Sequence, residues 1–160
     1  MTANDVWSES LKSSHIKDET LAIESQVLKD ALAEWSRHGS IPARSQLTAR
    51  ASKAFLGHLM IFERQGATFR IRLMGTRIAA VLGEMQGQTV DEALPAEVAA
   101  RWNAAINDVL DGGKPQRIAK TVAFKDLHFL NAEIFLAPLL DGEGKPNMVF
   151  AVAAFRSGVA

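Results

Sequence analysis

The clearest feature of the sequence is an alternation of apolar and polar side chains over residues 68–74. In an extended chain, one face carries Phe69, Ile71 and Leu73 and the other carries Arg70, Arg72 and Met74. Side chains of a β-strand point alternately to its two faces, so this period of two predicts a strand. Another strand is expected over residues 59–63, before a tight turn at Gln65-Gly66, and the two segments predict a β-hairpin.

Apolar residues at helical spacing fill the middle of the chain. Short helices are expected over residues 48–56 and from Thr76 to about residue 82. A longer helix is expected over residues 95–110, because proline suits a first helical turn and two glycines end the repeat. Three more strands are predicted over residues 116–124, 128–139 and 147–155. This order predicts an α+β fold, with a five-stranded antiparallel sheet and helices on one face.

An amphipathic helix is predicted ahead of this domain. Asp18 and Thr20 can cap a helix that continues to about Arg37. Its apolar stripe, the candidate interface, consists of Leu21, Leu28, Leu32 and Trp35. Such a stripe packs on the domain's own sheet or pairs with a second copy of the chain, so a homodimer through this helix stays open. The expected division is a tail over 1–17, the helix over 18–40, the domain over 41–156 and a tail over 157–160.

The composition narrows the class of protein. With 160 residues, 48% of them hydrophobic, the chain suits one domain. The absence of cysteine excludes disulfides, thiolate catalysis and zinc–thiolate sites. No apolar run is long enough for a membrane span, and the polar N-terminal residues lack the apolar core of a secretory signal. A cytoplasmic protein without a membrane span is therefore expected.

The net charge is zero, but the charges are unevenly distributed. Residues 35–77 carry eight basic side chains and one acidic side chain, whereas residues 1–34 and 78–113 are acidic. Internal neutralisation explains this pattern most simply. A basic surface for a nucleotide or an acidic partner is the alternative. Because the overall charge is zero, no nucleic-acid partner is expected.

Arg72 is the polar side chain that most needs an explanation. Its strand is expected near the middle of the sheet, where an unpaired guanidinium would be costly to bury. An ion pair with Glu133 is the preferred interpretation, and Glu63 is the other candidate partner. Alternatively, Arg72 anchors a carboxylate or phosphate through its two-pronged donor geometry.

Other chemistry finds little support in the sequence. The four histidines, His15, His38, His58 and His128, show no spacing typical of metal ligands, so no metal site is expected. An enzyme that uses a buried carboxylate, either Glu133 or Asp126 beside His128, is a remote alternative. No second catalytic group can be placed near either carboxylate, so the protein is not expected to be an enzyme.

Several short motifs occur in order between Trp35 and Phe155. They are Trp35, Pro42-Ala43-Arg44, Arg72-Leu73-Met74-Gly75-Thr76, Gly83, Gly87, Gly113-Lys114-Pro115, Glu133 and Leu136-Ala137-Pro138-Leu139. Together with the order of strands and helices, these motifs resemble the PAS domain, in particular a family of single-domain PAS proteins common in alphaproteobacteria. The resemblance implies a PAS fold that encloses a pocket between sheet and helices.

This resemblance also implies a class of function. PAS domains act as sensory or docking modules, often as dimers and often coupled to histidine kinases or cyclic dinucleotide signalling. Their pockets hold haem, flavin, small metabolites or nothing, so the cofactor stays open. The lack of cysteine argues against flavin–cysteine photochemistry, and the lack of histidine in residues 95–110 argues against haem.

Two hypotheses follow from the resemblance. Because no segment of the sequence is typical of an output domain, the preferred one is an adaptor that regulates signalling proteins, such as histidine kinases, by direct contact. The alternative is a sensor of a metabolite or nucleotide, with Arg72 as its anchor and Trp102 in the cavity wall. The candidate pocket residues are Arg72, Ile78, Leu82, Trp102, Ile106, Ile118, Phe124, Glu133, Phe135 and Phe150.

Overall fold

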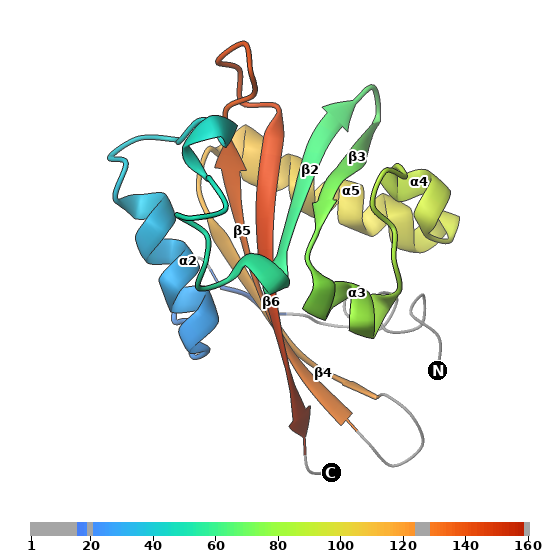
Figure 1. Ribbon diagram of the computed structural model, residues 1–160. Coiled ribbons are helices and arrows are strands. Elements are labelled where there is room, and N and C mark those ends of the chain that lie inside the picture. Colours follow the sequence, from blue (N-terminus) through green and yellow to red (C-terminus); the bar gives the residue numbers. More distant parts are fainter. Residues whose placement is uncertain (1–15, 19–20, 124–128, 159–160) are drawn as a thin grey trace.

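One antiparallel sheet organises the whole domain (Figure 1). The computed structural model describes residues 16–18, 21–123 and 129–158. Within these residues, six strands lie in the order β1-β4-β5-β6-β2-β3. Their bounds are β1 Ile16–Asp18, β2 Leu59–Gln65, β3 Thr68–Met74, β4 Gln116–Ala123, β5 Phe129–Leu139 and β6 Met148–Gly158. The five predicted strands are therefore present, and the short β1 extends the sheet beyond β4.

Helices cover the two faces of the sheet unequally (Figure 1). On one side lie α3 Thr76–Leu82, α4 Val90–Ala93 and α5 Ala96–Gly112, and on the other lies α2 Gln26–Ser36. Two short 3₁₀ turns, Arg44–Gln46 and Leu56–His58, complete the described helical segments. The predicted helical layer is thus confirmed on one face, and α2 packs on the opposite face of the same sheet.

Alternation along β5 and β6 divides the core into two parts. Ile134 and Leu136 face the layer of α3 to α5, while Phe135 and Leu139 face α2. Each of these residues exposes less than a tenth of its surface. Since neighbouring residues of a strand point to opposite faces, the two parts of the core are separated only by the thickness of the sheet.

The first helix is shorter than the sequence suggests. Residues 18–40 were expected to be helical from about Thr20, but α2 begins at Gln26. Leu21 has a φ of 55°, in the left-handed region, and Ser25 is extended with a ψ of 133°. The domain limits also differ, since β1 lies partly in the expected N-terminal tail and β6 continues to Gly158.

The helix predicted over residues 48–56 is absent. Thr48 does form one turn, in which its hydroxyl oxygen accepts a hydrogen bond from the Ala51 amide at 3.1 Å. Phe55 then leaves the helical region with a φ of −132°. Its buried ring lies 6.4 Å from the ring of Phe150, centroid to centroid. Packing of the aromatic ring into the α2 side of the core therefore overrides the local helical spacing.

A β-bulge corrects the predicted faces of β3. Ile61 pairs with Leu73 and Phe62 pairs with Ile71, so Arg72 has no partner of its own in β2. The extra residue reverses the alternation. Met74, and not Leu73, therefore joins Phe69 and Ile71 in the core beneath α3 to α5, while Leu73 packs on the α2 side.

Gly75 should be intolerant of any side chain. A Cβ at this position would collide with the backbone carbonyl groups of Leu56 and Gly57, which cannot move as a flexible side chain can. We expect Gly75→Ala to lower the free energy of unfolding by about 1–3 kcal/mol, the usual cost of overpacking. Urea denaturation measures this loss. Gly142→Ala is the control, because nothing lies within 4 Å of its Cβ position; equal stability of the two variants would contradict the prediction.

Candidate functional site

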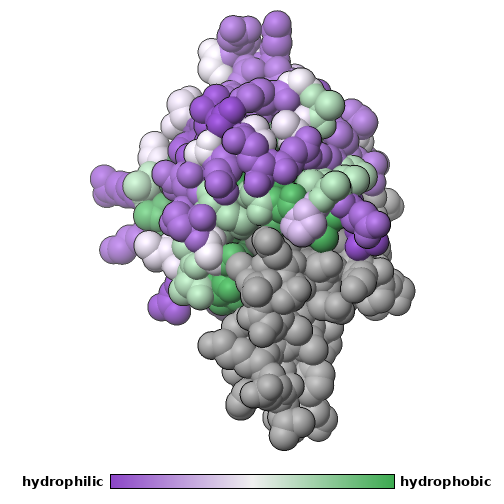
Figure 2. Space-filling view, turned by 90° about the vertical axis from the view of Figure 1, so that its right-hand side faces the viewer, coloured by the Kyte–Doolittle hydropathy of each residue, from purple (hydrophilic) through white to green (hydrophobic). Residues whose placement is uncertain are grey.

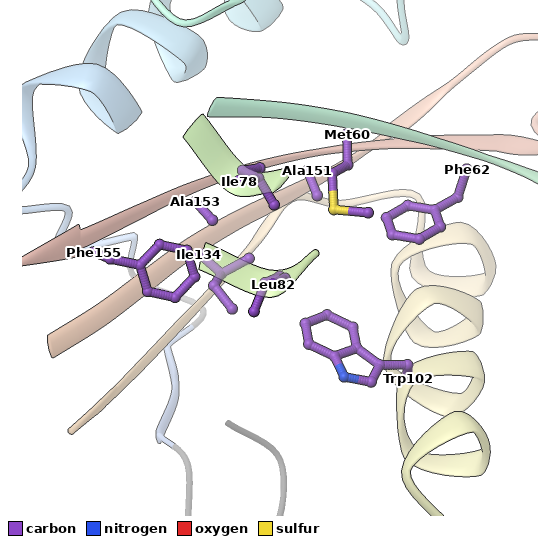
Figure 3. Close-up of a pocket in the computed structure, with 9 residues that line it drawn as sticks. All are labelled: Met60, Phe62, Ile78, Leu82, Trp102, Ile134, Ala151, Ala153 and Phe155. Carbon is purple, nitrogen blue, oxygen red and sulfur yellow. The ribbon is translucent and has the colours of Figure 1, made fainter. Parts of the chain in front are cut away.

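An apolar cavity lies between the sheet and the layer of α3 and α5 (Figure 3). Its volume is about 20 Å³. The lining side chains come from β2, α3, α5, β5 and β6, and are Met60, Phe62, Ile78, Leu82, Trp102, Ile134, Ala151, Ala153 and Phe155. A space of this size holds roughly one water molecule. In this conformation the side chains of the protein therefore fill most of the space between sheet and helices.

Three predicted pocket residues, Ile78, Leu82 and Trp102, line this cavity. Ile106 and Ile118 are buried in the same part of the core but do not line it. The remaining contributions from β2, β5 and β6 were missed by sequence reasoning. Small residues such as Ala151 and Ala153 gave no signal in the sequence, yet their size is what leaves the space open.

Phe135 and Phe150 lie on the opposite face of the sheet. They pack edge to face, 5.5 Å apart between ring centroids, and belong to the core beneath α2. The prediction that they line the pocket is wrong, because the position of a residue in the alternation along its strand decides which face its side chain joins, whatever its size. Phe124 lies outside the described residues.

Arg72 lies at the surface and does not line the cavity. Its strand, β3, is an edge strand and not a central one. The Arg72 guanidinium contacts the Glu63 carboxylate at 2.6 Å, and about half of the arginine side chain is exposed. The expected ion pair between Arg72 and Glu133 is therefore wrong, and the second candidate partner, Glu63, is the correct one.

Glu133 instead forms a buried cluster with Arg117 and the start of α2. Arg117 Nε donates a hydrogen bond to Glu133 Oε2 at 2.7 Å. The backbone amides of Glu24 and Ser25 donate to the two carboxylate oxygens at 2.9 and 2.8 Å. Glu133 and Arg117 are only 7% and 8% exposed. The carboxylate thus fastens the residues just before α2 to the middle of the sheet.

These contacts control the ionisation of Glu133. Burial by itself raises the pKa of the carboxyl group, but hydrogen bonds from Glu24, Ser25 and Arg117 outweigh this effect and lower the pKa from 4.5 to about 2. The side chain is therefore a carboxylate at neutral pH. A general base or acid needs a pKa nearer the working pH, so this residue is better suited to holding structure than to proton transfer.

The candidate interface residues, three on α2 and Leu21 ahead of it, differ in accessibility. Leu28 is fully buried against the sheet, whereas Leu21, Leu32 and Trp35 are only partly covered. Trp35 Nε1 donates a hydrogen bond to the Pro138 carbonyl oxygen at 2.9 Å. Residues at the margins of the helix contact, and not at its centre, thus remain accessible to another molecule.

The basic segment over residues 35–77 is partly neutralised from within. Arg37 contacts Glu34 at 2.6 Å, and Arg64 lies 3.9 Å from Asp111 at the end of α5. Arg64 also donates hydrogen bonds to Asn107 and Asn147. Acidic residues from the flanking segments therefore contact two of the arginines, in agreement with the simpler of the two interpretations of the charge pattern.

The described histidines have local partners. His58 Nδ1 lies 3.0 Å from the Ala153 carbonyl oxygen, and His38 Nε2 lies 3.0 Å from Glu34 Oε2. His15, His128 and Asp126 lie outside the described residues. Within the described part of the chain, no three histidine, aspartate or glutamate side chains are grouped to hold a metal ion. No described helix is long and apolar enough to cross a membrane.

The sequence matches the model of a known protein family over most of its length. The model of the family PAS_5, described as a PAS domain, matches residues 23–153. The chain therefore belongs to the PAS domain family, whose members are signal-sensing modules. No curated protein matches the sequence.

Solved structures with a similar fold include domains of light-oxygen-voltage (LOV) receptors. The light state of the blue-light photoreceptor Aureochrome1 LOV shares 15% identity with a TM-score of 0.44, over 68% of this chain and 87% of that one. A LOV domain studied with a flavin analogue shares 16% identity with a TM-score of 0.46, over 67% and 82%. An RNA-binding LOV receptor shares 12% identity with a TM-score of 0.49, over 89% and 38%. At these values the comparison carries no functional argument.

Replacing the Glu133 carboxylate should destabilise the protein strongly at neutral pH. Glu133→Gln replaces the buried carboxylate that Arg117 Nε contacts, so we expect a loss of about 3 kcal/mol in the free energy of unfolding. The lowered pKa of Glu133 corresponds to a similar amount, roughly 3 kcal/mol. This contribution is present above pH 4.5 and is lost as the pH falls towards 2. Urea denaturation at pH 7 and pH 3 measures the difference in free energy of unfolding between the native protein and Glu133→Gln. This difference should be smaller at pH 3.

Glu63→Gln provides the matched control. It removes the partner of the half-exposed Arg72, and such pairs contribute at most about 1 kcal/mol. Two results would contradict the stabilising role of the Glu133 carboxylate. One is an equal loss in the free energy of unfolding for both variants, and the other is a loss for Glu133→Gln that does not change with pH.

Proposed function

We propose that the protein is a sensory PAS module that regulates a signalling protein, such as a histidine kinase, by direct contact through α2. The observation that carries this proposal is the position of two adjacent residues in β5. Ile134 lines the apolar cavity on one face of the sheet, and Glu133 holds the start of α2 on the other. A shift of β5 on the cavity side would therefore act directly on the attachment of α2.

The packing of α2 supports a role in contact with another protein. Leu28 and Ala31 are buried and keep the helix on β5 and β6. Val27, Leu32 and Trp35 flank this contact and remain partly exposed. Apolar and aromatic residues at the edge of a helix contact can extend into an interface with a partner. A histidine kinase or a second copy of this chain would fit such a surface, and a cytoplasmic location would give access to these partners.

The second candidate function is a small-molecule sensor that uses the apolar cavity. The specific observation in its favour is that the cavity lies between the sheet and α3 and α5, with Trp102 in its wall (Figure 3). Arg72 is at the surface, so the anchor for a ligand in this cavity must be another residue. Sensing and contact are compatible, because a ligand shifts a conformational equilibrium when it binds one state better.

Site-specific crosslinking tests the contact function. Ala33 is exposed on α2, and a photoreactive phenylalanine analogue at this position should capture a signalling protein in cells. The matched control is the same analogue at Glu143, which is exposed in the turn between β5 and β6. We expect one signalling protein to be recovered, by mass spectrometry, from the Ala33 position and not from the Glu143 position. Equal recovery from the two positions, or recovery of no signalling protein, would contradict contact through α2.

A further inference from the structure

A groove on the surface of α3 adjoins the apolar cavity. Its volume is about 220 Å³, and it is lined by His58, Arg77, Ile78, Ala80, Val81 and Phe155. Ile78 and Phe155 belong to the lining of the cavity as well. Figure 3 shows Phe155 and Ala153 at one end of the cavity, with Trp102 and Phe62 at the other. The groove therefore lies at the Phe155 end of the cavity, and Ile78 and Phe155 form the wall between the two.

The groove is lined mainly by apolar side chains, with one arginine, Arg77, at its margin. Arg77 is exposed in the first turn of α3, and no described residue forms an ion pair with it. Its stem lies over Gly57, where an added Cβ would come within 3.3 Å of Arg77 Cγ. The glycine thus leaves room for the arginine to lie along the groove. None of the residues that line the groove is acidic.

His58 is fixed beside the groove by a strand that lines the cavity. Its Nδ1 lies 3.0 Å from the carbonyl oxygen of Ala153, whose side chain lines the cavity. A carbonyl oxygen can only accept a hydrogen bond, so Nδ1 carries the proton and donates it. The donor that the groove offers to a ligand is therefore the Arg77 guanidinium, which favours an anionic head group.

Apolar residues also gather on this side of the molecule. Figure 2 views the protein from the side on which Figure 1 places α3 and α4, and shows a band of apolar residues below a mainly polar upper part. Val81 is partly exposed and Ala80 is exposed in the groove. An alkyl chain that lies on these residues would contact Ile78 and Phe155, the two side chains that the groove shares with the cavity.

We propose that the groove is a site for an amphiphilic carboxylate, with the head group at Arg77 and an unbranched alkyl chain along Ile78, Val81 and Phe155. This proposal rests on the small-molecule sensor function. It names a ligand class, and it replaces Arg72 with Arg77 as the anchoring residue. Because the lining is apolar, each added methylene group should tighten binding by about fourfold while the chain still finds space.

Calorimetric titration of the whole chain with three probes below their micellar concentrations tests this site. Decanoate, decanol and decyltrimethylammonium share an alkyl chain but carry a negative, a neutral and a positive head group. We expect decanoate to bind at least about tenfold more tightly than decanol, and decyltrimethylammonium to bind most weakly, since a charge-assisted hydrogen bond is worth about this factor. Octanoate should bind more weakly than decanoate.

Two arginine variants make the test specific. Arg77→Gln should weaken decanoate binding by about tenfold and leave decanol binding unchanged. Arg72→Gln is the control, because it removes an arginine outside the groove and should change neither affinity. Both side chains are exposed, so the variants should fold, which a thermal melt verifies.

The possible failures are distinguishable. Equal binding of decanoate and decanol, unaffected by Arg77→Gln, would overturn the anionic head group while leaving a ligand-binding groove in place. Binding that is weakened equally by Arg72→Gln and Arg77→Gln would indicate general electrostatic attraction and would overturn the site. Binding of none of the three probes would overturn the site and remove the support for the sensor function, whereas contact through α2 would be unaffected.

Discussion

The buried carboxylate of Glu133 is the interaction on which the arrangement of this domain depends. A charge in the interior is costly unless its hydrogen-bonding capacity is met, and here one side chain and two backbone amides meet it. Arg117 belongs to β4, Glu133 to β5 and the amides to the segment before α2. One carboxylate therefore joins three parts of the chain, and it holds the segment before α2 on the face of the sheet that α2 covers.

The same strand connects this cluster to the cavity. Adjacent residues of β5 point to opposite faces, so Ile134 contacts the cavity and Glu133 contacts α2 without any intermediate residue. A PAS domain senses signals, and coupling needs an element whose arrangement both sites can bias. In the proposed function β5 is that element. The apolar cavity, the groove at Arg77 and the helix α2 would then be parts of one mechanism, in which ligand binding on one face of the sheet changes the attachment of α2 on the other.

The sequence predicted local features well and distant pairings poorly. The bounds of β3 were correct because alternation and the following turn are local signals. The partner of Arg72 was wrong because a bulge and an edge position depend on how β2 pairs with its neighbours. The start of α2 was missed for a similar reason, since the acceptor for the Ser25 amide lies 108 residues away. For the pocket, large residues such as Phe150 were predicted in place of Ala151. The alternation of side chains along β6 places only the smaller residue in the cavity wall.

Hydrogen exchange of the Glu24 and Ser25 amides tests the central role of Glu133 most directly. These two amides precede α2, so the helix itself offers them no acceptor, and the carboxylate is their partner. NMR-detected exchange at neutral pH should show slow exchange of both amides in the native protein. In Glu133→Gln, the account predicts much faster exchange of these amides and of α2, with β2 and β3 unchanged. Fast exchange in the native protein, or equal protection in the variant, would contradict the claim that this carboxylate holds α2 on the sheet.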